Sequence, residues 1–295
     1  MKKIISLILA VLMMAAMFAG CQPKTNDPLA DKADTTATKA PEATTASEAT
    51  EAAKPEAKTV TVGYTIYEPM NYKDESGKLI GYDTELAEKV FANLGYTVIF
   101  KEIDWKAKYT EVNSGSIDCI WNGFTCNTSD DDGIARADKV DFSYNYMENR
   151  QVVVAKKDSG IKAAADLAGK LGAAETGSAG ETYGKDTFKD AVIKGFDVQT
   201  KCLLEVKSGT ANFAILDAQL AKSYCGKGDY ADLEIVEGLD SEVEYYAIGF
   251  KKGSDLTANV NAQLDALAKD GTIAALADKY GVANTAIKDF ADQKK

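Results

Sequence analysis

Residues 103–125 read IDWKAKYTEVNSGSIDCIWNGFT, and this stretch decides the fold class. Trp105 precedes a short helical pattern that Gly115 ends, and a hydrophobic strand follows that stops at Asn122. The same alternation of short hydrophobic strands with helices of about ten residues runs from Thr59 onward. It indicates an α/β protein with mostly parallel sheets and helices on both faces.

The expected elements follow from the same pattern. We predict strands over 59–64, 96–103, 151–155, 213–217 and 245–250, a hairpin with its turn at Ser76-Gly77, and helices over 84–94, 255–269 and 272–280. Ligands of open α/β sheets bind at the carboxyl ends of the strands. Those ends are 122–125, 175–179 and 217, which supply hydroxyls, amides at a glycine-containing helix start, and a carboxylate.

Composition excludes several classes of function. The net charge of −11 argues against a nucleic-acid partner. The chain has no histidine, which removes the commonest general base and most zinc sites. We therefore expect no metal, no cofactor and no catalytic residue.

The N-terminus reads MKKIISLILAVLMMAAMFAGC, with two lysines, an apolar run and a small-residue end, which predicts an export signal over 1–20. The residues Phe18-Ala19-Gly20 before Cys21 resemble the lipobox of bacterial lipoproteins, and that resemblance implies cleavage before Cys21 and lipidation of its thiol. The alternative is an ordinary secretory signal with a chance cysteine. Residues 21–58, rich in Thr, Ala, Glu and Pro, then form the lipidated N-terminus and a disordered tether.

The remaining cysteines are Cys119, Cys126, Cys202 and Cys225. Their spacing matches no metal-binding pattern. Disulfides and free thiols both stay open for an exported protein.

From 59 to 281 the chain resembles the extracytoplasmic solute-binding proteins of polar amino-acid ABC importers, family 3. The segments that carry the resemblance are EPMNYKDESGKLIGYDTELAEKV, the opening stretch, VDFSYNYMENRQVVVAKK and DGTIAALADKYG. The resemblance implies a type II periplasmic-binding-protein fold with lobes 59–148 plus 247–295 and 149–246. The two crossover strands would lie near 147–151 and 242–246. It also implies a lipid-anchored monomer at the extracellular face of the membrane, which passes a free L-amino acid to an ABC permease.

A zwitterionic ligand needs a counter-charge at each end, because a buried unpaired charge costs several kcal/mol. The resemblance assigns the ligand carboxylate to Arg136 and to the amides of the loop that contains Ser178 and Ala179, and the ammonium to Asp217. Arg136 follows a loop, 126–135, that is longer than the common form, and a solvated surface position is its alternative. The alternative for Asp217 is a helix N-cap.

The resemblance places Trp105 and Tyr67 as aromatic walls for the ligand side chain, and the alternative for each is a place in the hydrophobic core. It places Gly123 and Thr125 near the ammonium, with Asn122 as a polar contact for the end of the side chain. The amino acid itself stays open, with cystine, glutamine and other polar or basic ligands as candidates. Two rival functions are a dehydratase-like enzyme that uses Glu175 and Asp217, and a sensor that acts through a separate receptor.

Overall fold

The structure is a computed structural model that describes residues 58–294. The expected signal peptide, the lipidation site Cys21 and the tether therefore lie outside the described residues.

The first of two five-stranded sheets has the order β4-β1-β5-β14-β6. Strands β4, β1 and β5 run parallel, and β14 runs antiparallel to β5 and β6. Helix α1 packs on β4 and is itself covered by α7 and α8. The bounds are β1 Lys58–Tyr64, β4 Tyr96–Glu102, β5 Cys119–Ile120, β6 Asp141–Phe142, β14 Gly249–Phe250, α1 Tyr82–Asn93, α7 Leu256–Lys269 and α8 Thr272–Lys279.

The second sheet has the order β10-β9-β11-β8-β12. Strands β10, β9 and β11 run parallel, and β8 runs antiparallel to β11 and β12. Helices α4, α5 and α6 pack against it. The bounds are β8 Gln151–Lys156, β9 Leu171–Glu175, β10 Val192–Phe196, β11 Phe213–Asp217, β12 Leu233–Ile235, α4 Ala179–Thr187, α5 Gln199–Ser208 and α6 Ala218–Tyr224.

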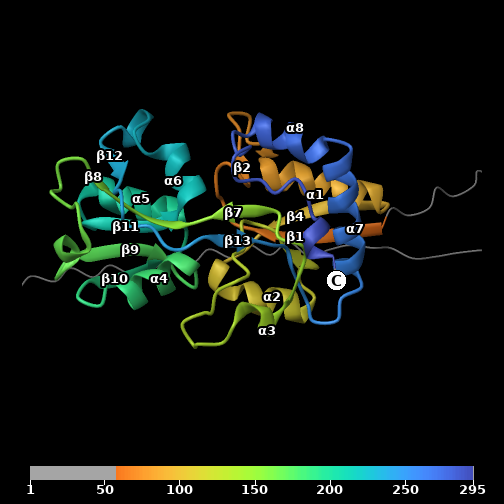
Figure 1. Cartoon of the computed structure of the whole chain (residues 1–295), viewed down its shortest axis with the longest axis horizontal. Coiled ribbons are helices and arrows are strands. Elements are labelled where there is room, and N and C mark those ends of the chain that lie inside the picture. Colours follow the sequence, from red (N-terminus) through yellow and green to blue (C-terminus); the bar gives the residue numbers. More distant parts are fainter. Residues whose placement is uncertain (1–57, 295) are drawn as a thin grey trace, which may run out of the picture. The chain divides into compact units, whose positions relative to one another are not determined.

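Two strands connect the two sheets. Strand β7 (Met147–Asn149) pairs antiparallel with β13 (Glu244–Tyr246), and both run between the sheets (Figure 1). The expected single strand over 245–250 was wrong, because the chain divides there into β13 and β14. The pairing explains the division: β13 bonds to β7, whereas β14 bonds to β5 and β6, so the chain changes partners between Tyr246 and Gly249.

The remaining elements are short. The predicted hairpin is formed by β2 (Tyr72–Lys73) and β3 (Leu79–Ile80), and the Asp74 carboxylate in its turn accepts hydrogen bonds from the backbone N–H groups of Ser76 and Lys78. The others are α2 Lys108–Ser114, α3 Arg136–Lys139 and the 3₁₀ turns Trp105–Ala107, Ala164–Leu167, Gly228–Tyr230 and Ala291–Gln293.

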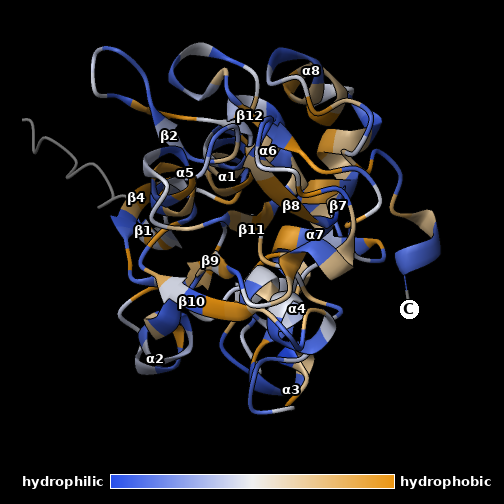
Figure 2. Ribbon diagram, turned by 90° about the vertical axis from the view of Figure 1, so that its left-hand side faces the viewer, coloured by the Kyte–Doolittle hydropathy of each residue, from blue (hydrophilic) through white to orange (hydrophobic). Residues whose placement is uncertain are grey.

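Burial follows the expected apolar pattern. Helix α1 buries Leu86, Val90 and Phe91, and Gly95 follows its end with φ at 80°. The central strands of the second sheet, β8, β9 and β11, are hydrophobic in Figure 2, as expected for strands covered on both faces. Among residues 58–294, we find no helix with the length and apolar character of a membrane span. Cys119, Cys126, Cys202 and Cys225 are free thiols.

Candidate ligand-binding site

A small enclosed cavity lies between the two sheets, near the strand ends that the sequence indicated. The first-sheet side contributes Trp105, Asn122, Gly123, Thr125 and Arg136, and the second-sheet side contributes Glu175, Ser178, Ala179, Gln199 and Asp217. Its volume is about 10 Å³, which is room for about one water molecule. Its walls must therefore move apart before a larger ligand can enter.

Arg136 begins α3, and its side chain is only 1% exposed. Its Nε donates to Asp130 Oδ1 at 2.8 Å, its Nη1 to the Thr125 carbonyl at 3.2 Å and its Nη2 to the Gly177 carbonyl at 3.4 Å. A guanidinium has five N–H donors, so one donor remains on each Nη. These two donors are available for the two oxygens of a carboxylate.

The long loop before Arg136 aims the side chain rather than diverting it. The backbone N–H of Arg136 donates to the Thr128 carbonyl, and the Asp130 carboxylate that pairs with Arg136 also accepts from Tyr109 Oη at 2.6 Å and Lys139 Nζ at 2.8 Å. Arg136 also lies over the Phe124 ring, 5.3 Å from its centroid. The alternative of a solvated surface arginine is excluded by this burial.

The glycine-containing loop across the cavity caps α4. Ser178 Oγ accepts from the Glu181 backbone N–H at 3.0 Å, while Glu181 Oε2 accepts from the Gly177 N–H at 2.7 Å. The Ser178 hydroxyl is therefore already used as a cap. The N–H of Ala179, the first helical residue, has no acceptor in the described part of the chain and lies at the positive end of the helix.

Asp217 ends β11, and its carboxylate is held by three side-chain amides. Oδ1 accepts from Asn149 Nδ2 at 2.8 Å and from Gln151 Nε2 at 2.6 Å, and Oδ2 accepts from Gln199 Nε2. Asp217 occupies the N-cap position of α6, as the alternative predicted, but its side chain makes no capping hydrogen bond and faces the cavity instead. Asp217 is 6% exposed, and no Lys or Arg pairs with it among residues 58–294.

A second buried acid, Glu244, lies beside Asp217. Its Oε1 accepts from Asn149 Nδ2, Gln151 Nε2 and Thr125 Oγ1. Burial raises the pKa of Glu244, and the charge of Asp217 raises it further. Burial also raises the pKa of Asp217, although the Gln199 and Gln151 amides oppose that shift. The carboxylate pair favours a cation nearby.

Glu175, at the end of β9, is another cavity acid. It is 3% exposed, and its Oε1 accepts no hydrogen bond from the described residues. Burial raises the pKa of Glu175 well above its ordinary range, and the charge of Asp217 adds to the shift. Lys108 opposes the shift, but its Nζ donates to the carbonyls of Gly177 at 2.9 Å and Trp105 at 3.4 Å.

The aromatic residues lie in different positions. Trp105 lines the cavity, with Lys108 Nζ 5.1 Å from the centroid of its ring. Tyr67 is 2% exposed but does not line the cavity; its Oη lies 2.7 Å from Tyr246 Oη. A Cβ on Gly123 would approach the Tyr67 ring to 2.6 Å, and Gly123 has φ at 57°, so both packing and backbone require glycine there.

Two polar residues of the first-sheet wall bond within the protein. Asn122 Nδ2 donates to the Thr65 carbonyl and to Asn71 Oδ1, and its Oδ1 accepts from Thr65 Oγ1. The side-chain amide of Asn122 is therefore already hydrogen-bonded within the protein, although the residue lines the cavity. The Thr125 hydroxyl donates to Glu244 Oε1 at 3.0 Å, which leaves its backbone N–H for a ligand.

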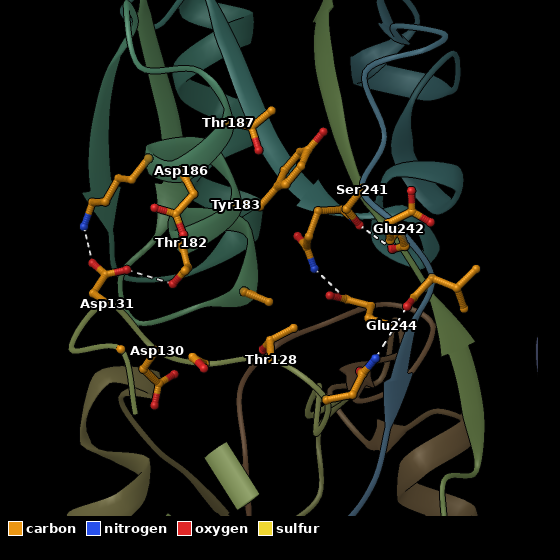
Figure 3. A pocket seen from close by; sticks show the side chains of 17 residues that line it. Thr128, Asp130, Asp131, Thr182, Tyr183, Asp186, Thr187, Ser241, Glu242 and Glu244 are labelled. Atoms are coloured by element: carbon orange, nitrogen blue, oxygen red, sulfur yellow. Dashed lines mark hydrogen bonds and ion pairs between the residues drawn. The ribbon is translucent and has the colours of Figure 1, made fainter. Parts of the chain in front are cut away.

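A larger cavity of about 700 Å³ lies next to the enclosed one, and Ala179 lines both. It lies between the loop that carries Asp130 and Asp131, helix α4 and residues 241–244 (Figure 3). Asp131 crosses from the first-sheet side to α4, where it accepts from Thr182 Oγ1 at 2.7 Å and pairs with Lys185. Together with the Lys108 and Arg136 bonds to Gly177, these contacts hold the two sides together.

Sequence reasoning missed the residues that hold Asp217. Gln199 lines the cavity, donates to the carboxylate and accepts from the Asp217 backbone N–H at 2.9 Å. It follows β10, so the rule of carboxyl strand ends could have found it. No local signal marks Asn149 and Gln151, because only the β7–β13 connection brings them to Asp217.

Two mixed α/β sheets, joined by paired strands and enclosing a polar cavity, define a type II periplasmic binding protein. The chain belongs to the bacterial extracellular solute-binding proteins, family 3, whose sequence model matches residues 60–283.

Its similarity to individual proteins extends over most of the folded region. It is 29% identical to the arginine-binding extracellular protein ArtP of Bacillus subtilis, over 72% of this chain and 82% of that protein. It is 32% identical to the L-cystine-binding protein TcyA of the same organism, over 72% and 77%. The crystal structure of an ABC uptake transporter substrate-binding protein from Streptococcus pneumoniae with bound histidine superposes with a TM-score of 0.69, at 31% identity, over 75% of this chain and 92% of that one.

Proposed function

We propose that the chain binds a free L-amino acid in the enclosed cavity and delivers it to the membrane permease of an ABC importer. One observation carries the proposal: the cavity presents a guanidinium with a donor free on each Nη on one wall and a carboxylate without a cation partner on the other. A zwitterion supplies both missing partners.

Each end of the ligand has its own set of contacts. The ligand carboxylate bonds to the two remaining N–H donors of Arg136 and to the Ala179 amide, where the helix end adds a favourable field. The ligand ammonium bonds to Asp217, whose three amide donors fix the carboxylate in place. Trp105 then lies against the ligand side chain.

Binding closes two lobes about the β7–β13 connection. We assign residues 59–148 and 247–295 to the first lobe and 149–246 to the second. Arg136 and Asp217 come from different lobes, so the ligand bridges them and closure is favoured by differential binding to the closed state. The closed geometry seen here, with Lys108 and Arg136 both donating to Gly177, supports this assignment.

The family is extracellular by its description. We propose further that Cys21 carries a lipid and that residues 21–58 tether a monomeric binding domain to the outer face of the cell membrane. The permease then meets the closed, ligand-loaded form. Labelling with a radioactive fatty acid, lost in Cys21→Ser, tests the anchor.

We assign no catalytic step to the site. A dehydratase would use Glu175 or Asp217 as its acid, and Asp217 is already committed to the ligand ammonium. The chain has no histidine that could act as the general base beside such an acid. A product assay by mass spectrometry after incubation with each bound amino acid separates the two functions, because a binding protein returns its ligand unchanged.

The test of binding is a thermal-shift panel. The purified full-length chain, freed of bound ligand, is unfolded in the presence of each L-amino acid and of cystine. A ligand at 100 times its dissociation constant stabilises the protein by about 2.7 kcal/mol, which is visible as a rise in melting temperature. Arg136→Ala should abolish the shift, while Arg150→Ala, at the partly exposed arginine outside the cavity, should preserve it. The proposal fails if no amino acid shifts the wild-type protein.

A further inference from the structure

Glu175 is a cavity carboxylate that the zwitterion clamp does not use. It ends β9, lines the cavity, and has only 3% of its surface exposed. Its Oε1 has no hydrogen-bond donor among the described residues. A buried carboxylate oxygen without a donor costs free energy, so its retention here points to a donor that arrives with the ligand.

The neighbouring donors are committed elsewhere. Lys108, a buried cation whose charge lowers the pKa of Glu175, donates to the carbonyls of Gly177 and Trp105 and makes no ion pair with Glu175. Gln199 Nε2 donates to Asp217 Oδ2, and although its amide lowers the pKa of Glu175, it makes no hydrogen bond to Glu175 Oε1. No side chain within 58–294 therefore donates a hydrogen bond to Glu175 Oε1.

The carboxyl groups that line the cavity outnumber its basic groups. Two carboxyl groups, Glu175 and Asp217, line the cavity with one guanidinium, Arg136, which itself pairs with Asp130. A third buried acid, Glu244, lies beside Asp217 and accepts from the same two amides. A neutral zwitterion satisfies Arg136 and Asp217 and leaves Glu175 alone. A ligand with a positive side chain supplies both the missing donor and the missing charge.

We propose that Glu175 makes the site selective for a basic L-amino acid, by accepting a hydrogen bond from the cationic side chain of the ligand. This inference rests on the proposed function. Arginine, lysine and ornithine carry the required group; glutamine, citrulline and cystine carry no net positive charge.

The same placement couples binding to proton release. In the empty site, burial and the charge of Asp217 raise the pKa of Glu175, Asp104 adds to the rise, and Lys108 opposes it. The carboxyl group therefore holds a proton to higher pH than an exposed glutamate does. A cation that binds beside it favours the carboxylate, so the proton leaves to solvent as the ligand enters.

The test is isothermal titration calorimetry on full-length wild-type protein and Glu175→Gln, with L-arginine, L-lysine, L-ornithine, L-citrulline and L-glutamine. Wild type should bind the tightest basic amino acid at least about 30-fold more tightly than citrulline or glutamine. Glu175→Gln should lose at least about 30-fold for the basic amino acids and change the neutral ones less than about threefold. Glu237→Gln, at an exposed position, is the matched control.

Proton release supplies a readout that a merely structural role would not move. Titrations in buffers of different ionisation enthalpy should show protons released on arginine binding by wild type and fewer by Glu175→Gln. The inference is overturned if wild type prefers a neutral amino acid, or if Glu175→Gln weakens basic and neutral ligands equally with unchanged proton release. If no amino acid binds wild type at all, the proposed function has failed instead.

Discussion

Asp217→Asn is the most informative single substitution, because it keeps the shape of the side chain, removes its charge and changes one acceptor oxygen into a donor. The ligand ammonium then has no carboxylate partner in a buried site. The Asp217 carboxylate is held by three amides and by no cation, so the substitution leaves no protein cation unpaired. Removal of one partner from a buried, hydrogen-bonded charge pair costs about 2–5 kcal/mol. That corresponds to an affinity loss between about 30-fold and several thousand-fold.

The same substitution should weaken ligand binding but stabilise the ligand-free protein at higher pH. Burial raises the folded-state pKa of Asp217 above its unfolded value, so between the two the folded protein binds more protons than the unfolded one. The free energy of unfolding of wild type then falls as the pH rises through that window. Asparagine has no such loss, so the melting temperature of the variant relative to wild type should increase from pH 4 to pH 8. One donor–donor contact with Gln199 reduces the gain, because the Gln199 carbonyl is held by the Asp217 backbone N–H.

Calorimetric titration with the tightest amino acid of the panel measures the first effect, and thermal unfolding across pH measures the second. Asp229→Asn is the control, because its side chain is 92% exposed and should change neither quantity. Binding by Asp217→Asn within about threefold of wild type would refute the assignment of the ligand ammonium to this carboxylate. A melting temperature that falls relative to wild type as the pH rises would refute the account of its burial.

Three further substitutions test other parts of the structure. Asp131→Asn removes the ion pair with Lys185 that joins the two sides of the cavity. Because both side chains are more than 40% exposed, ligand binding should weaken by at most about 1 kcal/mol, or fivefold in affinity. Calorimetric titration should show that this difference disappears in high salt. Equal losses at low and high salt would contradict this. Burial raises the pKa of Asp83 to about 7, so wild-type stability should fall from about pH 4 to about pH 7, and urea unfolding of Asp83→Asn should show a flatter profile and a gain of a few kcal/mol above pH 7. An unchanged profile would exclude Asp83 as the cause. Trp105→Phe should remove the ligand-induced change in tryptophan fluorescence, whereas Trp121→Phe, in the core, should retain it; the reverse result would place the ligand elsewhere.

The class of fold and the approximate position of the site follow from local sequence patterns alone. Strand and helix periods depend on which residues within a few positions are apolar, so the pattern around Leu86, Val90 and Phe91 placed α1 without knowledge of the rest of the chain. The carboxyl ends of the strands then indicated Asn122, Glu175 and Asp217, and all three line the cavity.

The contacts of each of those side chains depend on the three-dimensional fold. Asn122 lines the cavity, but its side-chain amide donates to Thr65 and Asn71. Asp217 accepts hydrogen bonds from the side-chain amides of residues 149, 151 and 199. The single strand expected over 245–250 divides for the same reason, since its two halves bond to different partners. A hydrogen bond has a distance and a direction, and these depend on segments far apart in sequence. The local pattern could therefore place an acid at Glu175 but could not show that its oxygen lacks a donor.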